Sequence, residues 1–358
     1  MHAIEKIMNL VLKPKGDSPI FYCMLLVNDL KNNFFFEEVK SSDLGTLLTS
    51  SSQFKTGSIT KPFTAAVIFQ LFEEGLINLD DLFLDVLDNE KKSILSGIHI
   101  FNEQDYSSKI SIRHLLQHRS GLLDYFADDD RFRSQLMQYP ADSWNWKRTI
   151  AQYFKFDLNK KSAFEPGNGF YYSDTNYLLL ALLIEHITNQ PLFQCYEERI
   201  LRPLGLHETY LEYDQVPNNN SNIVYPFYGK LSLQNVNTSF DWGAGGLIST
   251  LHDLDIFIRS LINGQLFKNP ESINLMLQFV DTDVEKNKGK LYYGLGLQKK
   301  VINGYTFIGH TSSYGSMMFY EPNFKISIVL TLNQSVAIHK AGWMLQNIIK
   351  LLLPPNCQ

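Results

Sequence analysis

The sequence predicts an α+β fold, because strand-like segments gather at its two ends while helix-like segments fill the middle. Two apolar runs at 20–27 and 34–39, joined by a polar turn, predict a strand pair near the N-terminus. Similar runs near the C-terminus predict further strands, at 293–298, 305–308, 316–320 and 326–332. The simplest arrangement is one antiparallel sheet built from both ends, flanked by terminal helices, with a helical lobe inserted between them.

The size of the chain suits one catalytic domain of two lobes. Its 358 residues are 44% hydrophobic and 19% charged, as in a globular protein with a sizeable core. We expect a single domain over 18–350, with a sheet lobe at about 1–80 and 240–358 and a helical lobe at about 81–239. The apolar pattern predicts helices after Ser58 and at 112–118, 144–154, 176–188, 192–200, 251–262 and 337–353.

The composition disfavours several classes of partner. A net charge of −5 and a pI near 6.0 leave no basic excess for a nucleic acid. Cys23, Cys195 and Cys357 are too few and too far apart for a disulfide framework, and none has metal-ligand spacing. His114 and His118 are one helical turn apart, but they lack the intervening glutamate of a His-Glu-x-x-His motif and a third ligand. We therefore expect neither a metal nor a cofactor.

The chain shows no sequence signal for a membrane or for secretion. Residues 1–15 carry Glu5 and Lys6 and have only a short apolar stretch, unlike a signal peptide. The apolar run at 177–184 ends at Glu185 and is too short to span a bilayer. We expect no membrane span and, for the sequence as it stands, a cytoplasmic protein; removal of a leader would make it periplasmic or extracellular.

The pair Ser58 and Lys61 is the strongest candidate for chemistry. Residues three apart lie on the same face of a helical turn, and a lysine there can deprotonate a serine or hold a second base in place. Pro62 is tolerated only in the first turn of a helix, so the helix cannot begin much before Ser58. Free backbone N–H groups at that end favour a developing oxyanion, although a serine there is often only an N-cap. The pattern predicts a serine hydrolase.

Two further segments supply partners for this pair. At 166–174 a Gly/Pro turn delivers Tyr172 and Asp174 just before a helix, with Tyr171 as a close competitor. A tyrosine held near an ammonium group should have a lowered pKa and can act as a general base on serine. The second segment, 309–313, follows a predicted strand. That strand could border a cleft between the two lobes and supply a backbone N–H to the oxyanion.

Together these segments resemble the three motifs of serine penicillin-recognising enzymes. Ser-x-x-Lys is followed by Tyr-Ser-Asp at 172–174 and by His-Thr-Ser at 310–312, close to the His-Thr-Gly form of the third motif. The segments 54–65, 112–122, 244–250 and 293–297 also look like that family. The chain thus resembles the serine β-lactamase-like superfamily, in the branch of class C β-lactamases, D-alanyl-D-alanine carboxypeptidases and esterases, over roughly 18–350. The resemblance implies a β-lactamase/transpeptidase-like fold.

The resemblance also implies roles for individual residues. Ser58 would be the nucleophile that is acylated, with Lys61 and Tyr172 sharing the base and proton-shuttle roles. Asp174 would stand where the family has Asn, beside Lys61 and the substrate amide. His310 and Thr311 would bind the substrate carboxylate, and the backbone N–H of Ser313 would join that of Ser58 in the oxyanion site.

Three departures from the family pattern bear on the substrate. Asp174 adds a carboxylate, His310 replaces a lysine, and Ser312 replaces a glycine. They favour a D-alanyl-D-alanine carboxypeptidase-like peptidase or carboxylesterase over a β-lactamase, acting on a small molecule or short peptide with an ester or amide bond. The alternatives are a β-lactamase, an acyltransferase, or a catalytically silent relative that binds a peptide or partner protein.

Overall fold

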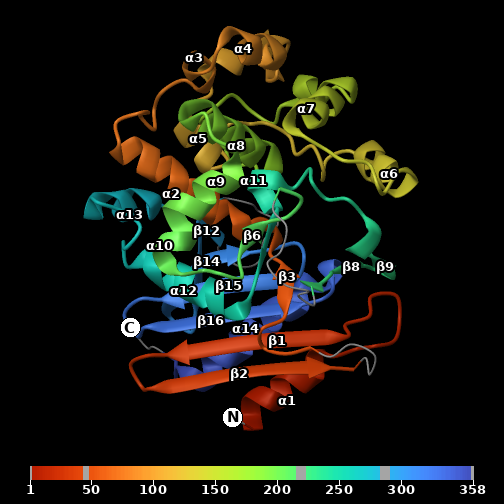
Figure 1. The fold of residues 1–358 in the computed structure, drawn as a ribbon, viewed down its shortest axis with the longest axis vertical. Helices are drawn as coiled ribbons and strands as arrows, with labels where there is room; N and C mark the ends of the chain where they lie inside the picture. Colours follow the sequence, from red (N-terminus) through yellow and green to blue (C-terminus); the bar gives the residue numbers. More distant parts are fainter. Residues whose placement is uncertain (1, 43–47, 215–222, 283–290, 356–358) are drawn as a thin grey trace.

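A sheet of eight antiparallel strands joins the two ends of the chain (Figure 1). The computed structural model describes residues 2–42, 48–214, 223–282 and 291–355. The N-terminal β1 pairs with the C-terminal β16, with Leu25 opposite Leu330. In spatial order the strands are β11 (Val280–Asp281), β12 (Leu291–Tyr293), β13 (Gln298–Ile302), β14 (Tyr305–Thr311), β15 (Ser316–Glu321), β16 (Ile326–Leu332), β1 (Tyr22–Asp29) and β2 (Phe34–Ser41). The predicted α+β fold with a sheet built from both ends is confirmed.

Both faces of this sheet are buried. Alternate residues of β1 point to opposite faces: Leu25 and Val27 pack with α1 (His2–Val11) and α14 (Ile338–Leu352), whereas Leu26 belongs to the core shared with the other helices. A strand that is apolar on both faces is typical of a sheet covered on both sides. The terminal helices therefore cover one face, as the sequence predicted.

Helices α2 (Thr60–Glu73) and α8 (Asp174–Thr188) form the centre of the helical body. They contact each other, and both contact α11 (Trp242–Gly245). Every residue from Thr60 to Phe69 is buried, so α2 is enclosed on all sides rather than on one apolar face. The other α-helices are α3 (Phe83–Val86), α4 (Asn89–Leu95), α5 (Ile112–Leu116), α6 (Asp130–Gln138), α7 (Trp146–Lys155), α9 (Leu192–Tyr196), α10 (Arg202–Leu204), α12 (Leu251–Ile262) and α13 (Pro270–Met276).

A second, smaller sheet leads into the Ser58 segment. Its four strands, in the order β6 (Tyr210–Leu211), β10 (Leu247–Ser249), β3 (Gln53–Lys55) and β7 (Ile223–Val224), are two or three residues long. Such short strands show no alternation of apolar and polar residues in the sequence, so they were not predicted. Because β3 ends three residues before Ser58, this sheet fixes where the following helix begins.

Three local predictions need correction. The expected strand at 293–298 is divided between β12 and β13, because the chain turns through Gly294 and Gly296, and Gly296 has a φ of +94°. A Cβ at Gly296 would lie 2.4 Å from the Cβ of Ala65, so only glycine fits there. The expected helix at 192–200 changes to π-helical hydrogen bonding at Glu197–Leu201. The expected helix at 144–154 begins two residues later, after an Asn145 cap.

The described residues also bear on membranes and cysteines. Cys23 and Cys195 are buried and unbonded to each other, and Cys357 lies outside the described residues. In the described part of the chain no helix has the length and apolar character needed to cross a membrane. Two hairpins, β4–β5 (Ile100–Phe101, Gln104–Asp105) and β8–β9 (Phe227–Tyr228, Leu231–Ser232), complete the fold. The division into the two predicted lobes stays a prediction.

Candidate active site

Ser58 lies in a short helical turn, Gly57–Ile59, that continues directly into α2. Gly57 adopts a left-handed conformation with a φ of +54°. A Cβ at this position would come within 2.2 Å of the Ser312 Oγ and 2.9 Å of the Tyr314 ring. The glycine thus lets the nucleophile segment lie directly against the turn between β14 and β15.

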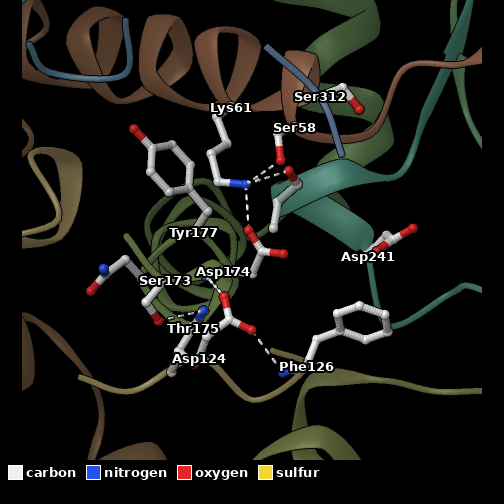
Figure 2. A network of polar contacts seen from close by, with 12 residues as sticks. Ser58, Lys61, Asp124, Phe126, Ser173, Asp174, Thr175, Tyr177, Asp241 and Ser312 are labelled. Carbon is white, nitrogen blue, oxygen red and sulfur yellow. Dashed lines mark hydrogen bonds and ion pairs between the residues drawn. The ribbon is translucent and has the colours of Figure 1, made fainter. Parts of the chain in front are cut away.

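Lys61 is completely buried and uses all three of its N–H donors (Figure 2). Its Nζ lies 3.2 Å from the Ser58 Oγ, 2.5 Å from the Asp174 Oδ1 and 2.9 Å from the Ala244 carbonyl oxygen. Burial alone would lower the pKa of Lys61, but Asp174 and Tyr172 together outweigh it and raise that pKa. Lys61 is therefore an ammonium group that orients Ser58, and it must lose a proton before it can act as a base.

Tyr172 lies next to Lys61, whereas Tyr171 points elsewhere. The Lys61 Nζ is 5.0 Å from the centre of the Tyr172 ring, and both Lys61 and Ser58 favour the phenolate form of Tyr172. The Tyr171 hydroxyl donates instead to Asp128, at 2.6 Å. Of the two competing tyrosines, the structure brings Tyr172 to the nucleophile.

The predicted lowering of the Tyr172 pKa is wrong. Burial raises the pKa of Tyr172 to about 12, and the nearby Asp174 carboxylate adds to the rise, although Lys61 opposes it. The burial comes from rings that the sequence separates widely: His118 at 4.3 Å between ring centres and Tyr293 at 6.0 Å. In the resting site Tyr172 is thus a neutral phenol.

Asp124 holds Asp174 in place, a role that the sequence did not predict. Its Oδ2 accepts the Asp174 backbone N–H at 2.6 Å, and its Oδ1 accepts those of Phe126 and Ala127, both at 2.8 Å (Figure 2). Burial and the Asp174 charge raise the pKa of Asp124 to about 7. Asp124 follows by two residues the segment 112–122 that resembles the family, so the signal lay just beyond the segment considered.

His310 and Thr311 are less accessible than we expected for residues that bind the substrate carboxylate. His310 is completely buried; its Nε2 lies 3.0 Å from the Tyr293 hydroxyl and its Nδ1 2.8 Å from the Thr311 carbonyl oxygen. Burial and the Lys61 charge lower the pKa of His310 to about 3, so the ring is neutral near pH 7. Thr311 donates from its N–H and its hydroxyl to the Gln298 side chain. The structure brings His310 near Tyr172 but gives it no charge for a carboxylate.

The turn after β14 places Ser312 and Ser313 differently. Ser312 is buried beside Gly57, and its Oγ accepts the Tyr314 backbone N–H at 3.0 Å. Ser313 is exposed at the tip of the turn. The Tyr314 hydroxyl donates to the Asp241 Oδ2 at 2.6 Å, and burial raises the pKa of Asp241 to about 7. Tyr314 and Asp241 were not anticipated, because neither belongs to a motif.

The absence of a metal stays a prediction. Among the described residues, no group of three or more His, Cys, Asp or Glu side chains is arranged to hold a metal ion. His118, one of the two histidines considered, accepts the Ser173 backbone N–H at its Nδ1, 3.1 Å away. That nitrogen is therefore already used within the fold.

Comparisons with known proteins show the family and the fold of this chain. The Beta-lactamase family profile matches residues 35–349. A putative D-alanyl-D-alanine carboxypeptidase of Escherichia coli O157:H7 is 23% identical over 80% of this chain and 70% of its own length. A penicillin-binding protein of Bacillus subtilis (strain 168) is 31% identical over 45% of this chain, but over only 31% of its own length.

A solved structure matches nearly the whole chain. The D-stereospecific amidohydrolase from a Streptomyces species has a TM-score of 0.77 and 25% identity, over 99% of this chain and 98% of its own. The family and the fold predicted from the three motifs are confirmed, and with them the general class of serine hydrolases. The chain belongs to the beta-lactamase family.

Proposed function

We propose that the chain is a serine hydrolase that works through an acyl-enzyme on Ser58, as a D-alanyl-D-alanine carboxypeptidase-like peptidase or a carboxylesterase. The observation that carries the proposal is the 3.2 Å contact between the Ser58 Oγ and the Lys61 Nζ, within a network that also holds Asp174. We further propose that 18–350 form one catalytic domain. The names of the relatives support hydrolysis of an amide or peptide bond, and the three departures from the family motifs make β-lactamase activity the alternative.

Acylation begins with attack of the Ser58 Oγ on the substrate carbonyl carbon. The Lys61–Tyr172 pair first releases one proton to solvent, because both groups are protonated in the resting site. The deprotonated pair then accepts the Ser58 proton as the new C–O bond forms, and it returns that proton to the departing alkoxide or amine as the old bond breaks. The carbonyl oxygen gains its negative charge near the N-terminal end of α2 and the Ser313 N–H. Water then attacks the ester carbon, releasing the acid and restoring the Ser58 hydroxyl.

Labelling of Ser58 tests this proposal. The folded protein should gain the mass of one fluorophosphonate less HF, or of one whole fluorescent penicillin, on the peptide that contains Ser58. The Ser58→Ala variant should gain neither mass. Absence of labelling by both probes in folded wild-type protein would contradict the proposal and favour the silent, binding-only alternative.

A further inference from the structure

We propose that a groove beside Ser58 binds an uncharged apolar acyl group of the substrate, an inference that rests on the proposed hydrolase function. The groove has a volume of about 860 Å³, within the range of sites that hold small organic ligands. Its walls come from four regions that are distant in sequence: Phe126 with α6, the stretch from β8 to Phe240, the turn after β14, and Ser335 after β16. In Figure 1, α6 and the β8–β9 hairpin lie on the same side of the molecule.

The groove adjoins the nucleophile through residues that belong to both. Ser313 and Tyr314 line it, and Tyr314 also lies against Gly57, next to Ser58. On the other wall, Phe126 donates its backbone N–H to Asp124, which in turn holds Asp174 (Figure 2). A group bound in the groove would therefore lie next to a carbonyl presented to Ser58.

The lining is mostly apolar, and several of its large apolar side chains are exposed to solvent when no ligand is bound. Met137, Tyr228 and Leu231 are 46%, 53% and 41% exposed, so three large apolar side chains, from α6, β8 and β9, line one groove. A gathered apolar surface of this kind marks a binding site, whereas single exposed apolar residues do not. Behind them the groove is closed by buried residues, among them Leu136, Leu233, Val236 and Phe240.

The charges around the groove favour a neutral ligand. Of the described residues that line it, Asp130 and Arg133 are the charged ones, and they form an ion pair with each other. Arg133 also donates to the backbone carbonyl oxygens of Phe126 and Ala127. His310, on the strand that leads to the groove, is neutral for the reason given above. No free cation of the lining residues is left to attract a carboxylate.

The wall next to the nucleophile is held rigidly. Tyr314 donates its hydroxyl to Asp241 at 2.6 Å, and the Phe126 and Phe240 rings stack with their centres 5.5 Å apart. A fixed wall permits selection by length and shape of the acyl group, because little of the binding energy is lost in ordering side chains. We therefore expect the enzyme to prefer medium-length aliphatic or aryl acyl groups.

A series of p-nitrophenyl esters, from acetate to octanoate, tests this preference. We expect kcat/KM to rise about threefold per methylene from acetate to hexanoate, which corresponds to burial of most of each CH₂ group. The hemisuccinate, which is similar in length to butyrate but carries a carboxylate, should be hydrolysed at least about tenfold less efficiently than butyrate. A flat series, or a hemisuccinate as good as butyrate, would overturn the inference.

Variants of the exposed lining residues locate the effect in the groove. Leu231→Arg and Met137→Arg should lower kcat/KM for the octanoate by about tenfold and leave the acetate within about twofold. Leu351→Arg, at a residue 52% exposed on α14, is the matched control and should change neither. Equal losses for both esters, or no loss for the octanoate, would count against the groove.

Binding of Nile red to Ser58→Ala separates this inference from the proposed function. We expect Ser58→Ala to bind this neutral apolar dye, and the double variant Ser58→Ala/Leu231→Arg to bind it at least about fivefold more weakly. This result, without labelling of Ser58 in the wild type, would support binding of apolar groups in the groove and contradict the proposed hydrolase function. Labelled Ser58 with dye binding unaffected by Leu231→Arg would keep the hydrolase and reject the groove.

Discussion

The two sides of Ser58 differ in whether their side chains carry charge. On the α2 and α8 side, the buried Lys61 and the half-buried Asp174 form an ion pair 2.5 Å long, and Asp124 accepts the backbone N–H of Asp174. On the β14 side, His310 is neutral and the following turn presents hydroxyl groups, a tyrosine ring and an apolar groove. One side is thus suited to moving protons, and the other to accepting a neutral substrate.

The difference separates chemistry from selectivity. Changes on the charged side should affect all substrates alike, because every substrate needs the same serine to be activated. Changes on the neutral side should alter the ranking of substrates, because they act on groups that differ among them. The predictions that follow test the charged side, and the ester series tests the neutral one.

Removal of Lys61 should have the largest effect. Lys61→Met leaves Asp174 without its cation and Ser58 without its orienting donor, so we expect kcat/KM to fall at least about a thousandfold for acetate and octanoate alike. Lys55→Met is the matched control, because Lys55 is equally buried and paired with Glu212. Both variants should lose thermal stability, since each leaves a carboxylate unpaired. A comparable loss of activity in Lys55→Met would mean that stability, and not chemistry, explains the effect.

Loss of the Tyr172 hydroxyl should come next. Tyr172→Phe keeps the ring that packs on His118 but removes the group beside Ser58, so acylation should slow by roughly a hundredfold, as for loss of a general base. Tyr171→Phe removes a hydroxyl that donates to Asp128 and should leave the rate within about threefold. Single-turnover acylation is the measurement. A normal rate in Tyr172→Phe would assign the base role to Lys61 alone.

The sequence allowed more to be predicted about the placement of the nucleophile than about its electrostatics. Pro62 limits where α2 begins, and this local rule places Ser58 correctly at the start of the helix. Thr250 likewise caps α12, which spans the predicted 251–262. The positions of the longer strands of the eight-stranded sheet also followed from local pattern, except where Gly296 turns the chain between β12 and β13. The short strands of the second sheet did not.

The electrostatics could not be predicted because they depend on contacts between distant segments. The sequence indicates a cation near Tyr172, but the burial by His118 and Tyr293 that reverses the expected pKa shift arises only in the folded protein. His310 is neutral for the same reason. The groove likewise cannot be read from the sequence, because its walls come from four separate regions of the chain.

The smallest effect, and the one that most directly tests the charged side, is a shift in pH dependence. Burial lowers the pKa of Lys61, but Asp174 raises it, and Asp174 also adds to the raised pKa of Tyr172. With both groups protonated near neutral pH, kcat/KM should rise with pH as a base is released. Asp174→Asn removes the negative charge and keeps an acceptor for Lys61, so the pKa values of Lys61 and Tyr172 should both fall. The rising limb of the plot of kcat/KM against pH should then move to lower pH by about one unit, which is a tenfold change in kcat/KM at fixed pH.

A control variant distinguishes this local effect from a general change in charge. Asp128→Asn removes one negative charge from an exposed side chain whose carboxylate contacts Tyr171 and the Asp124 backbone, and it should move the limb by less than about 0.3 units because exposed charges are screened. If Asp174→Asn left the limb in place, the pKa values of Lys61 and Tyr172 could not control activation of Ser58. A shift of the limb to higher pH would mean that the Asp174 carboxylate itself accepts the Ser58 proton. The general base would then be Asp174, the residue that replaces the asparagine of the family motif.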